Sequence, residues 1–85
     1  MEIKKEKEMK IKILFFGILT DITNENNIEL EKINNITDLK SFLFKTYPKM
    51  KDMDFRIALN KEIINDTVIF KNNDEIALLP PFAGG

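Results

Sequence analysis

The stretch "NNDEIALLPPFAGG", residues 72–85, decides the fold because it predicts a buried strand that two prolines terminate. Its apolar run "IALL" at residues 76–79 follows a polar turn sequence, which is typical of a short strand. Pro80 and Pro81 must end that strand, since proline has no backbone N–H to give to a sheet. The residues that follow have no strand partner left and are predicted to leave the body of the protein.

The rest of the chain predicts further strands and one main helix. Between residues 35 and 48 the apolar side chains change to helical spacing, with Asn35 as the cap, Asp38 reaching back to the helix start, and Pro48 as the stop. A polar link is expected before residue 55, and residues 68–70 are expected to point inward. The predicted elements are strands at residues 11–16, 27–33, 55–60, 63–64 and 76–79, a turn or single helical turn within residues 20–27, and a helix over residues 36–47.

This order predicts an α+β fold, a mixed sheet with one main helix packed across it. The first and last strands come from opposite ends of the chain, so pairing them in parallel at the sheet centre would close the domain. That arrangement is a ubiquitin-like β-grasp. The predicted division is a charged N-terminal extension at residues 1–9, the β-grasp domain at residues 10–80, and an extended functional tail at residues 81–85.

The composition excludes several classes of function. Eighty-five residues suffice for one domain, and 13 basic against 14 acidic side chains argue against a nucleic-acid partner. Cysteine and histidine are absent, which removes thiolate nucleophiles, the usual general base near neutral pH and the commonest transition-metal ligands. We therefore expect no metal site, no bound cofactor and no self-contained catalysis.

The lysine-rich start before the apolar residues 13–19 faintly resembles a signal peptide. Glutamates interleave these lysines, however, and no small-residue cleavage site follows. The apolar run is also too short to span a bilayer. The sequence therefore predicts a cytoplasmic protein with no membrane partner.

The predicted tail has a chemistry that needs neither cysteine nor histidine. Its two prolines favour a stiff exit from the sheet, and "FAGG" at residues 82–85 adds an apolar anchor, a small spacer and two residues without a Cβ. The Gly85 carboxylate is unreactive until adenylation with ATP makes it a mixed anhydride. Sulfide could then displace AMP and leave a thiocarboxylate. The alternative is an idle tail, since small residues at a terminus are often only a linker.

Alternation along the first strand predicts a second functional surface. Lys12 marks one face of that strand as outward, and Leu14 and Phe16 share this face. If the last strand alternates in the same way, Ala77 and Leu79 join them. An exposed apolar patch at the centre of a small sheet suggests a protein interface. The alternative is that the N-terminal extension or a loop covers these residues.

Four segments resemble the family of molybdopterin synthase small subunits, which are ubiquitin-like sulfur carriers. These segments are "KILFFG", "NITDLKSFLFKTYP", "IALN" and "NNDEIALLPPFAGG", and the resemblance runs over residues 9–85. It implies a carrier whose Gly85 is adenylated by a ubiquitin-activating-like adenylyltransferase that uses ATP. A sulfur donor then supplies the thiocarboxylate. The tail inserts into the large subunit, where sulfur passes to cyclic pyranopterin monophosphate in molybdenum cofactor biosynthesis.

Matched residue by residue, the resemblance makes Gly85 the thiocarboxylate site and Gly84 its slender neighbour. The catalytic residues are then expected on the large subunit, with this chain as a consumed sulfur donor. The inserted arm would comprise Pro80, Pro81, Phe82 and Ala83.

Three positions depart from the family pattern, which often has arginine at Thr20, glycine at Asn73 and valine at Phe82. Asn73 can still serve the turn, because asparagine tolerates a positive φ. Phe82 requires a roomier pocket in the partner than valine would. Thr20 puts in doubt any charged contact at that point.

Other functions stay open beside this one. The chain could be another β-grasp sulfur carrier, supplying thiamine thiazole or tRNA thiolation, or a ubiquitin-like protein modifier. Thiazole carriers are usually shorter and lack "LLPPFAGG", which favours the first interpretation. A β-grasp binding module with an idle tail is the alternative from a different class.

Overall fold

The computed structural model describes residues 9–64 and 68–80. Residues 1–8 of the predicted extension and the whole predicted tail, residues 81–85, lie outside these described residues. The elements in chain order are β1 (Lys10–Phe15), α1 (Ile18–Thr23), β2 (Asn27–Glu31), α2 (Ile36–Thr46), the 3-10 helix η1 (Pro48–Asp52), β3 (Arg56–Leu59), β4 (Glu62–Ile63) and β5 (Glu75–Leu79).

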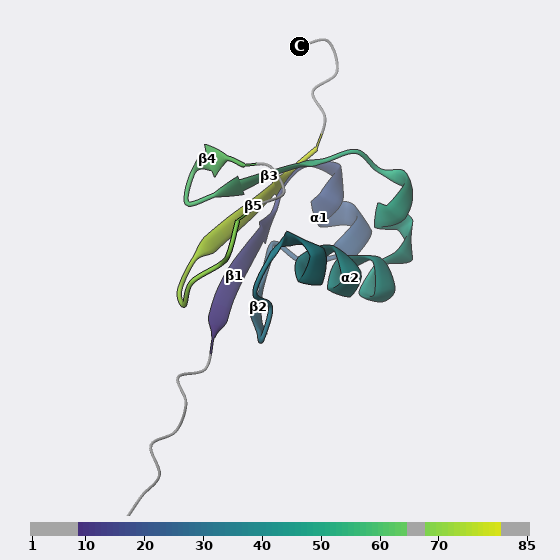
Figure 1. Ribbon diagram of the computed structural model, residues 1–85. Helices are drawn as coiled ribbons and strands as arrows, with labels where there is room; N and C mark the ends of the chain where they lie inside the picture. The colour runs from purple at the N-terminus through teal and green to yellow at the C-terminus, as the bar shows by residue number, and fades with distance from the viewer. Residues whose placement is uncertain (1–8, 65–67, 81–85) are drawn as a thin grey trace, which may run out of the picture.

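The strands form one mixed sheet in the order β2-β1-β5-β3-β4. The central strands β1 and β5 run parallel, and each neighbour outside them is antiparallel. Figure 1 shows β1 and β5 side by side, with α1 and α2 both on one side of the sheet. The predicted ubiquitin-like β-grasp is confirmed, including the parallel pairing of its first and last strands.

The main helix α2 begins where its sequence predicts. Asn35 has an extended backbone, and its side-chain oxygen accepts a hydrogen bond from the Asp38 backbone N–H at 2.8 Å. The Asp38 carboxylate reaches back and accepts from the Asn34 N–H at 3.2 Å. These two bonds satisfy N–H groups that a helix start leaves without partners. The helix ends at Thr46, just before the predicted stop at Pro48.

The core lies between α2 and the face of the sheet on which α2 packs. Phe15 meets Tyr47 edge-on at a centroid distance of 5.9 Å, which closes the core near the end of α2. No buried side-chain nitrogen or oxygen of the described residues lacks a hydrogen-bond partner. The buried cluster comprises Ile11, Ile13, Phe15, Leu19, Ile36, Leu39, Leu43, Met50, Ile57, Phe70, Ile76 and Leu78.

Three local predictions are wrong. The predicted polar link contains η1, whose Met50 is fully buried because the turn carries it under α2. The helical turn expected within residues 20–27 is α1, which begins at Ile18 instead. Ile69 was expected to point inward but is 70% exposed, whereas Phe70 is buried. Neighbouring residues of an extended segment point to opposite sides, so these two side chains cannot both reach the core.

The helices of the described residues are short. None of them is long and apolar enough to cross a bilayer.

The cap of α2 provides a test of helix stability. We expect Asn35→Ala to lower the free energy of unfolding by about 1 kcal/mol, because the Asp38 N–H loses its acceptor. Urea denaturation measures the difference. Asn34→Ala is the matched control, since Asn34 takes part in the cap through its backbone N–H, which alanine retains. Equal losses in the two variants would contradict this account of the helix start.

The titration of Tyr47 tests whether its phenol is partly buried in the folded protein. Burial, and secondarily the negative charge of Glu25, raise the pKa of Tyr47 above its usual value near 10. The folded chain then holds the phenol proton at a pH where the unfolded chain has lost it. Unfolding therefore releases a proton, and the unfolding free energy should fall as pH rises from about 10 through the folded pKa.

Tyr47 is the only tyrosine, so ultraviolet absorbance of the phenolate reports it alone. We expect a higher titration midpoint in the folded protein than in urea. Glu25→Gln should move the folded midpoint part of the way down, because it removes the weaker of the two causes. A folded midpoint at or below the unfolded one would refute the burial of this phenol.

Candidate functional site on the outer face of the sheet

The outer face of the sheet, defined as the face turned away from α2, carries the residues that alternate with the core. On β1, Ile11 and Ile13 are buried, which places Lys12 and Leu14 on the outer face. On β5, Ile76 and Leu78 are fully buried, which places Glu75, Ala77 and Leu79 there. Burial thus alternates along both central strands as the sequence predicts.

One half of this face is mainly apolar and crosses four strands, with the exposed Arg56 of β3 in register with Leu79 as its charged member. The strand register puts Leu14 beside Ala77, Ala77 beside Ala58, and Ala58 beside Ile63. We call this region the apolar half of the outer face. It comprises Leu14, Phe16, Ala58, Ile63, Ala77 and Leu79.

Exposure within the apolar half is concentrated at its margins. Phe16 follows the last residue of β1 and is 44% exposed, and Ile63 is 54% exposed. Leu14, Ala77 and Leu79 are half-buried between them. Two large, exposed apolar side chains joined by half-buried ones form a continuous surface that suits contact with another protein.

The sequence identified only part of the apolar half. Leu14, Phe16, Ala77 and Leu79 were predicted from alternation within single strands. Ala58 and Ile63 were missed, because their place beside Ala77 depends on the register between β5, β3 and β4. The turn of the "IALNKEII" hairpin sets the register between β3 and β4. Its two central residues, Asn60 and Lys61, both have positive φ, as a type I′ hairpin turn requires.

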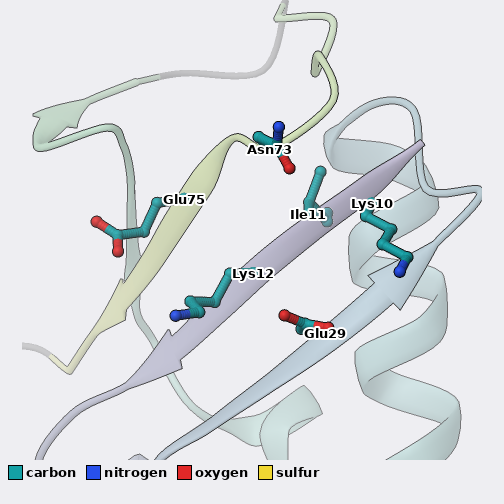
Figure 2. A pocket seen from close by; sticks show the side chains of 6 residues that line it. All are labelled: Lys10, Ile11, Lys12, Glu29, Asn73 and Glu75. Carbon is teal, nitrogen blue, oxygen red and sulfur yellow. The ribbon is translucent and has the colours of Figure 1, made fainter. Parts of the chain in front are cut away.

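The other half of the outer face is charged. Lys12 on β1 is paired in register with Glu29 on β2 and with Glu75 on β5. Figure 2 shows Lys12 between these two glutamates. They line a shallow pocket of about 300 Å³, to which Lys10, Ile11 and Asn73 contribute the remaining walls. Because the opposite charges alternate across neighbouring strands, this half offers a patterned polar contact surface.

The turn residues around the site serve local structure. Asn73 has φ of 72°, and its N–H donates to the Lys10 carbonyl at 2.7 Å. The predicted ability of Asn73 to replace a turn glycine is confirmed. The Thr20 hydroxyl donates to the Phe15 carbonyl at 3.1 Å, so this side chain supports the end of β1.

Of the site residues predicted in the tail, the structure describes only Pro80. Pro80 is half-buried directly after β5. The remaining ones, Pro81, Phe82, Ala83, Gly84 and Gly85, lie outside the described residues, and their roles stay predictions. No group of three acidic, histidine or cysteine residues that could hold a metal ion occurs within residues 9–64 and 68–80.

Comparison with solved structures supports the fold. A molybdopterin converting factor subunit 1 from Pyrococcus furiosus superposes with a TM-score of 0.79 at 21% identity, covering 87% of this chain and 99% of that one. One chain in the complex of subunits 1 and 2 of molybdopterin-converting factor from Helicobacter pylori gives a TM-score of 0.71 at 32% identity. That match covers 91% of this chain and 100% of the other.

Comparison of sequences identifies the family. The molybdopterin synthase sulfur carrier subunit of Mycobacterium tuberculosis is 29% identical over 82 residues, which cover 91% of this chain and 99% of that protein. The model of the ThiS family matches residues 13–85, from the middle of β1 through the two last glycines. The chain therefore belongs to the ThiS family.

Proposed function

We propose that this chain is the sulfur-carrier subunit of a molybdopterin synthase. The observation that carries the proposal is the family match, which continues past the folded body to Gly85. The relative from Mycobacterium tuberculosis bears the name of this subunit and is matched over 99% of its length. The Helicobacter pylori chain, at 32% identity, comes from a complex of subunits 1 and 2.

The reaction is carried by the Gly85 carboxylate. In the activating step, a carboxylate oxygen attacks the α-phosphorus of ATP, pyrophosphate leaves, and an acyl-adenylate forms on an adenylyltransferase. Sulfide supplied by a donor attacks the acyl carbon, the bond to AMP breaks, and a thiocarboxylate remains. ATP is bound by the activating enzyme, so the carrier needs no cofactor of its own.

The thiocarboxylate sulfur then forms a bond to a carbon of cyclic pyranopterin monophosphate in the large subunit, and water cleaves the bond between the Gly85 acyl carbon and sulfur, which leaves sulfur on the acceptor and regenerates the Gly85 carboxylate. This chain contributes no acid or base near neutral pH beyond carboxylates, since it has neither histidine nor cysteine. The catalytic residues therefore belong to the large subunit. The carrier supplies a reactive group at the end of residues 81–85, which can reach about 17 Å when extended.

The folded body supplies the docking surface. Its apolar half lies at the end of the sheet where β5 ends at Leu79 and Pro80 follows, so docking there brings the emerging tail to the same partner. The exposed ring of Phe16 is a suitable anchor, since aromatic residues dominate the energetics of many interfaces. The charged half extends the contact and favours partners with a complementary pattern.

The central prediction concerns a change in the mass of the protein that is located at Gly85. Protein incubated with ATP, a sulfur source and the activating enzyme should gain the mass difference between sulfur and oxygen at its C-terminus. Intact mass spectrometry followed by C-terminal peptide mapping locates the change. A variant with one residue appended after Gly85 should gain nothing, whereas one with the same residue added before Met1 should react normally. Reaction of the extended variant would contradict this chemistry.

The acceptor is tested by reconstitution. Thiocarboxylated protein, the large subunit and cyclic pyranopterin monophosphate should together yield molybdopterin. Formation of the thiocarboxylate without any conversion of this acceptor would reject molybdopterin synthase and leave another sulfur-carrier pathway.

The docking surface gives a separate prediction. Phe16→Ala should weaken binding to the large subunit by roughly tenfold or more, because it removes an aromatic anchor from the interface. Isothermal titration calorimetry measures the affinity. Ile69→Ala is the matched control: Ile69 is 70% exposed but pairs with Asn35 beside α2, away from the outer face. Equal losses in the two variants would place the interface elsewhere.

A further inference from the structure

The apolar half of the outer face continues, on its β3–β4 side, into a hollow of about 270 Å³. The hollow shares Arg56 and Ile63 with that face and extends to the start of α2, which packs on the other side of the sheet. We call this space the β4 hollow. Its lining residues are Ile36, Lys40, Phe55, Arg56, Ile57, Ile63 and Ile64.

The short edge strand β4 covers only part of β3. Glu62 and Ile63 are its two residues that pair with β3. Ile64 adds one hydrogen bond, from its N–H to the Ile57 carbonyl at 2.9 Å. Within residues 62–64, no residue pairs with Arg56, so the start of β3 lies beside the hollow.

The β4 hollow combines apolar walls with positive charge. Ile36 and Ile57 are buried, with 3% and 7% of their surface exposed, and Phe55 is half-buried. The charged residues among those that line it are Lys40, half-buried on α2, and Arg56, exposed on β3. An apolar space bordered by two cations suits an anionic group carried on an apolar stem.

The neighbouring acidic residues of the chain do not line the hollow. Asp54 and Glu62 stand next to lining residues in the sequence, but both are exposed and neither contributes to the lining. Lys12, in contrast, is paired in register with a glutamate on each side, whereas the partner of Arg56 on β5 is Leu79. The charge complement of the hollow is therefore expected from outside the chain.

We propose that the β4 hollow takes a carboxylate side chain of the large subunit when the apolar half docks. The inference rests on the proposed function, which supplies this partner. The guanidinium of Arg56 offers parallel N–H donors that match the two oxygens of a carboxylate, and Lys40 adds a second positive charge. Apolar walls that exclude water strengthen such a pair relative to one on an open surface.

The size and position of the hollow favour a protein side chain over a free ligand. Pockets for cofactors and drug-sized ligands usually have volumes of about 300–1,000 Å³. The β4 hollow lies below this range, at about 270 Å³. Its occupant must also cover Ile63, which is 54% exposed at the border with the apolar half. An aspartate or glutamate within an apolar partner surface meets both conditions.

A carboxylate in this position would make docking selective. Burial of apolar surface is not directional, so the apolar half alone would accept many apolar surfaces. A partner without the carboxylate would cover Arg56 and leave its N–H donors without acceptors, which is costly. The β4 hollow is thus the part of the interface that distinguishes the large subunit from other apolar partners.

Dissociation kinetics distinguish an enclosed charge pair from general electrostatic attraction. Arg56→Gln should raise koff from the large subunit by roughly tenfold and leave kon nearly unchanged, because an enclosed pair acts on dissociation. Arg56→Lys keeps the charge without the two-bond geometry and should give an intermediate koff. Biolayer interferometry measures both constants, and urea denaturation checks that each variant folds.

Lys45→Gln is the matched control. It removes the same charge from an exposed position on α2 that does not line the hollow. This variant should keep the koff of the wild type. Equal increases of koff in Arg56→Gln and Lys45→Gln would overturn the proposal, since they would show an effect of net charge alone.

Zero-length crosslinking identifies the occupant. A carbodiimide activates a carboxylate, and the amine of Lys40 then displaces the activating group to form an amide with a contacting aspartate or glutamate. Mass mapping of the wild-type complex should find Lys40 joined to the large subunit and Lys45 joined to none of its carboxylates. Lys40 joined only to Asp54 or Glu62 of its own chain would refute the proposed occupant.

The results separate this inference from the proposed function. A wild-type chain that does not bind the large subunit would reject both. A wild-type chain that binds and supports conversion of the acceptor, while Arg56→Gln dissociates at the wild-type rate, would overturn only the role of the β4 hollow.

Discussion

The parallel pairing of β1 with β5 is the interaction on which the rest of this structure depends. It joins the first strand of the domain to the last one, so the sheet closes only when nearly the whole chain is in place. The two strands bury Ile13, Phe15, Ile76 and Leu78 on one side, where α2 completes the core. Parallel strands also end at the same edge, and this fixes where the chain leaves the sheet.

The same pairing divides the outer face into two halves. Along β1 the outward residues change from lysine to leucine, and along β5 they change from glutamate to alanine and leucine. Because the strands run in the same direction, both changes occur at the same level of the sheet. The apolar half therefore lies toward the tail, and the charged half lies toward the start of β1. An antiparallel pairing would have mixed charged and apolar side chains across the two strands.

The sequence predicted the elements whose signals are local. The helix cap at Asn35, the stop at Pro48 and the alternation along "KILF" and "IALL" each depend on residues a few positions apart. The errors arose where contacts between residues far apart in the sequence determine which side chains are buried. Met50 has a lysine on each side in the sequence, which gives no indication of burial. It is buried because η1 lies against α2. Ala58, Ile63 and the contact of Gly17 with Pro80 all required the register between strands.

The three glycines of the chain can be understood through one constraint, close approach. Gly17 has a positive φ and lacks a side chain where the Pro80 ring lies. In the proposed function, Gly84 and Gly85 would meet the same requirement in a partner, where a narrow passage admits a backbone without Cβ atoms. In the proposed function the reactive group is the Gly85 carboxylate, and the chain has no cysteine or histidine. Under that proposal, docking of the apolar half of the outer face, which lies beside the end of β5, sets where the carboxylate is delivered.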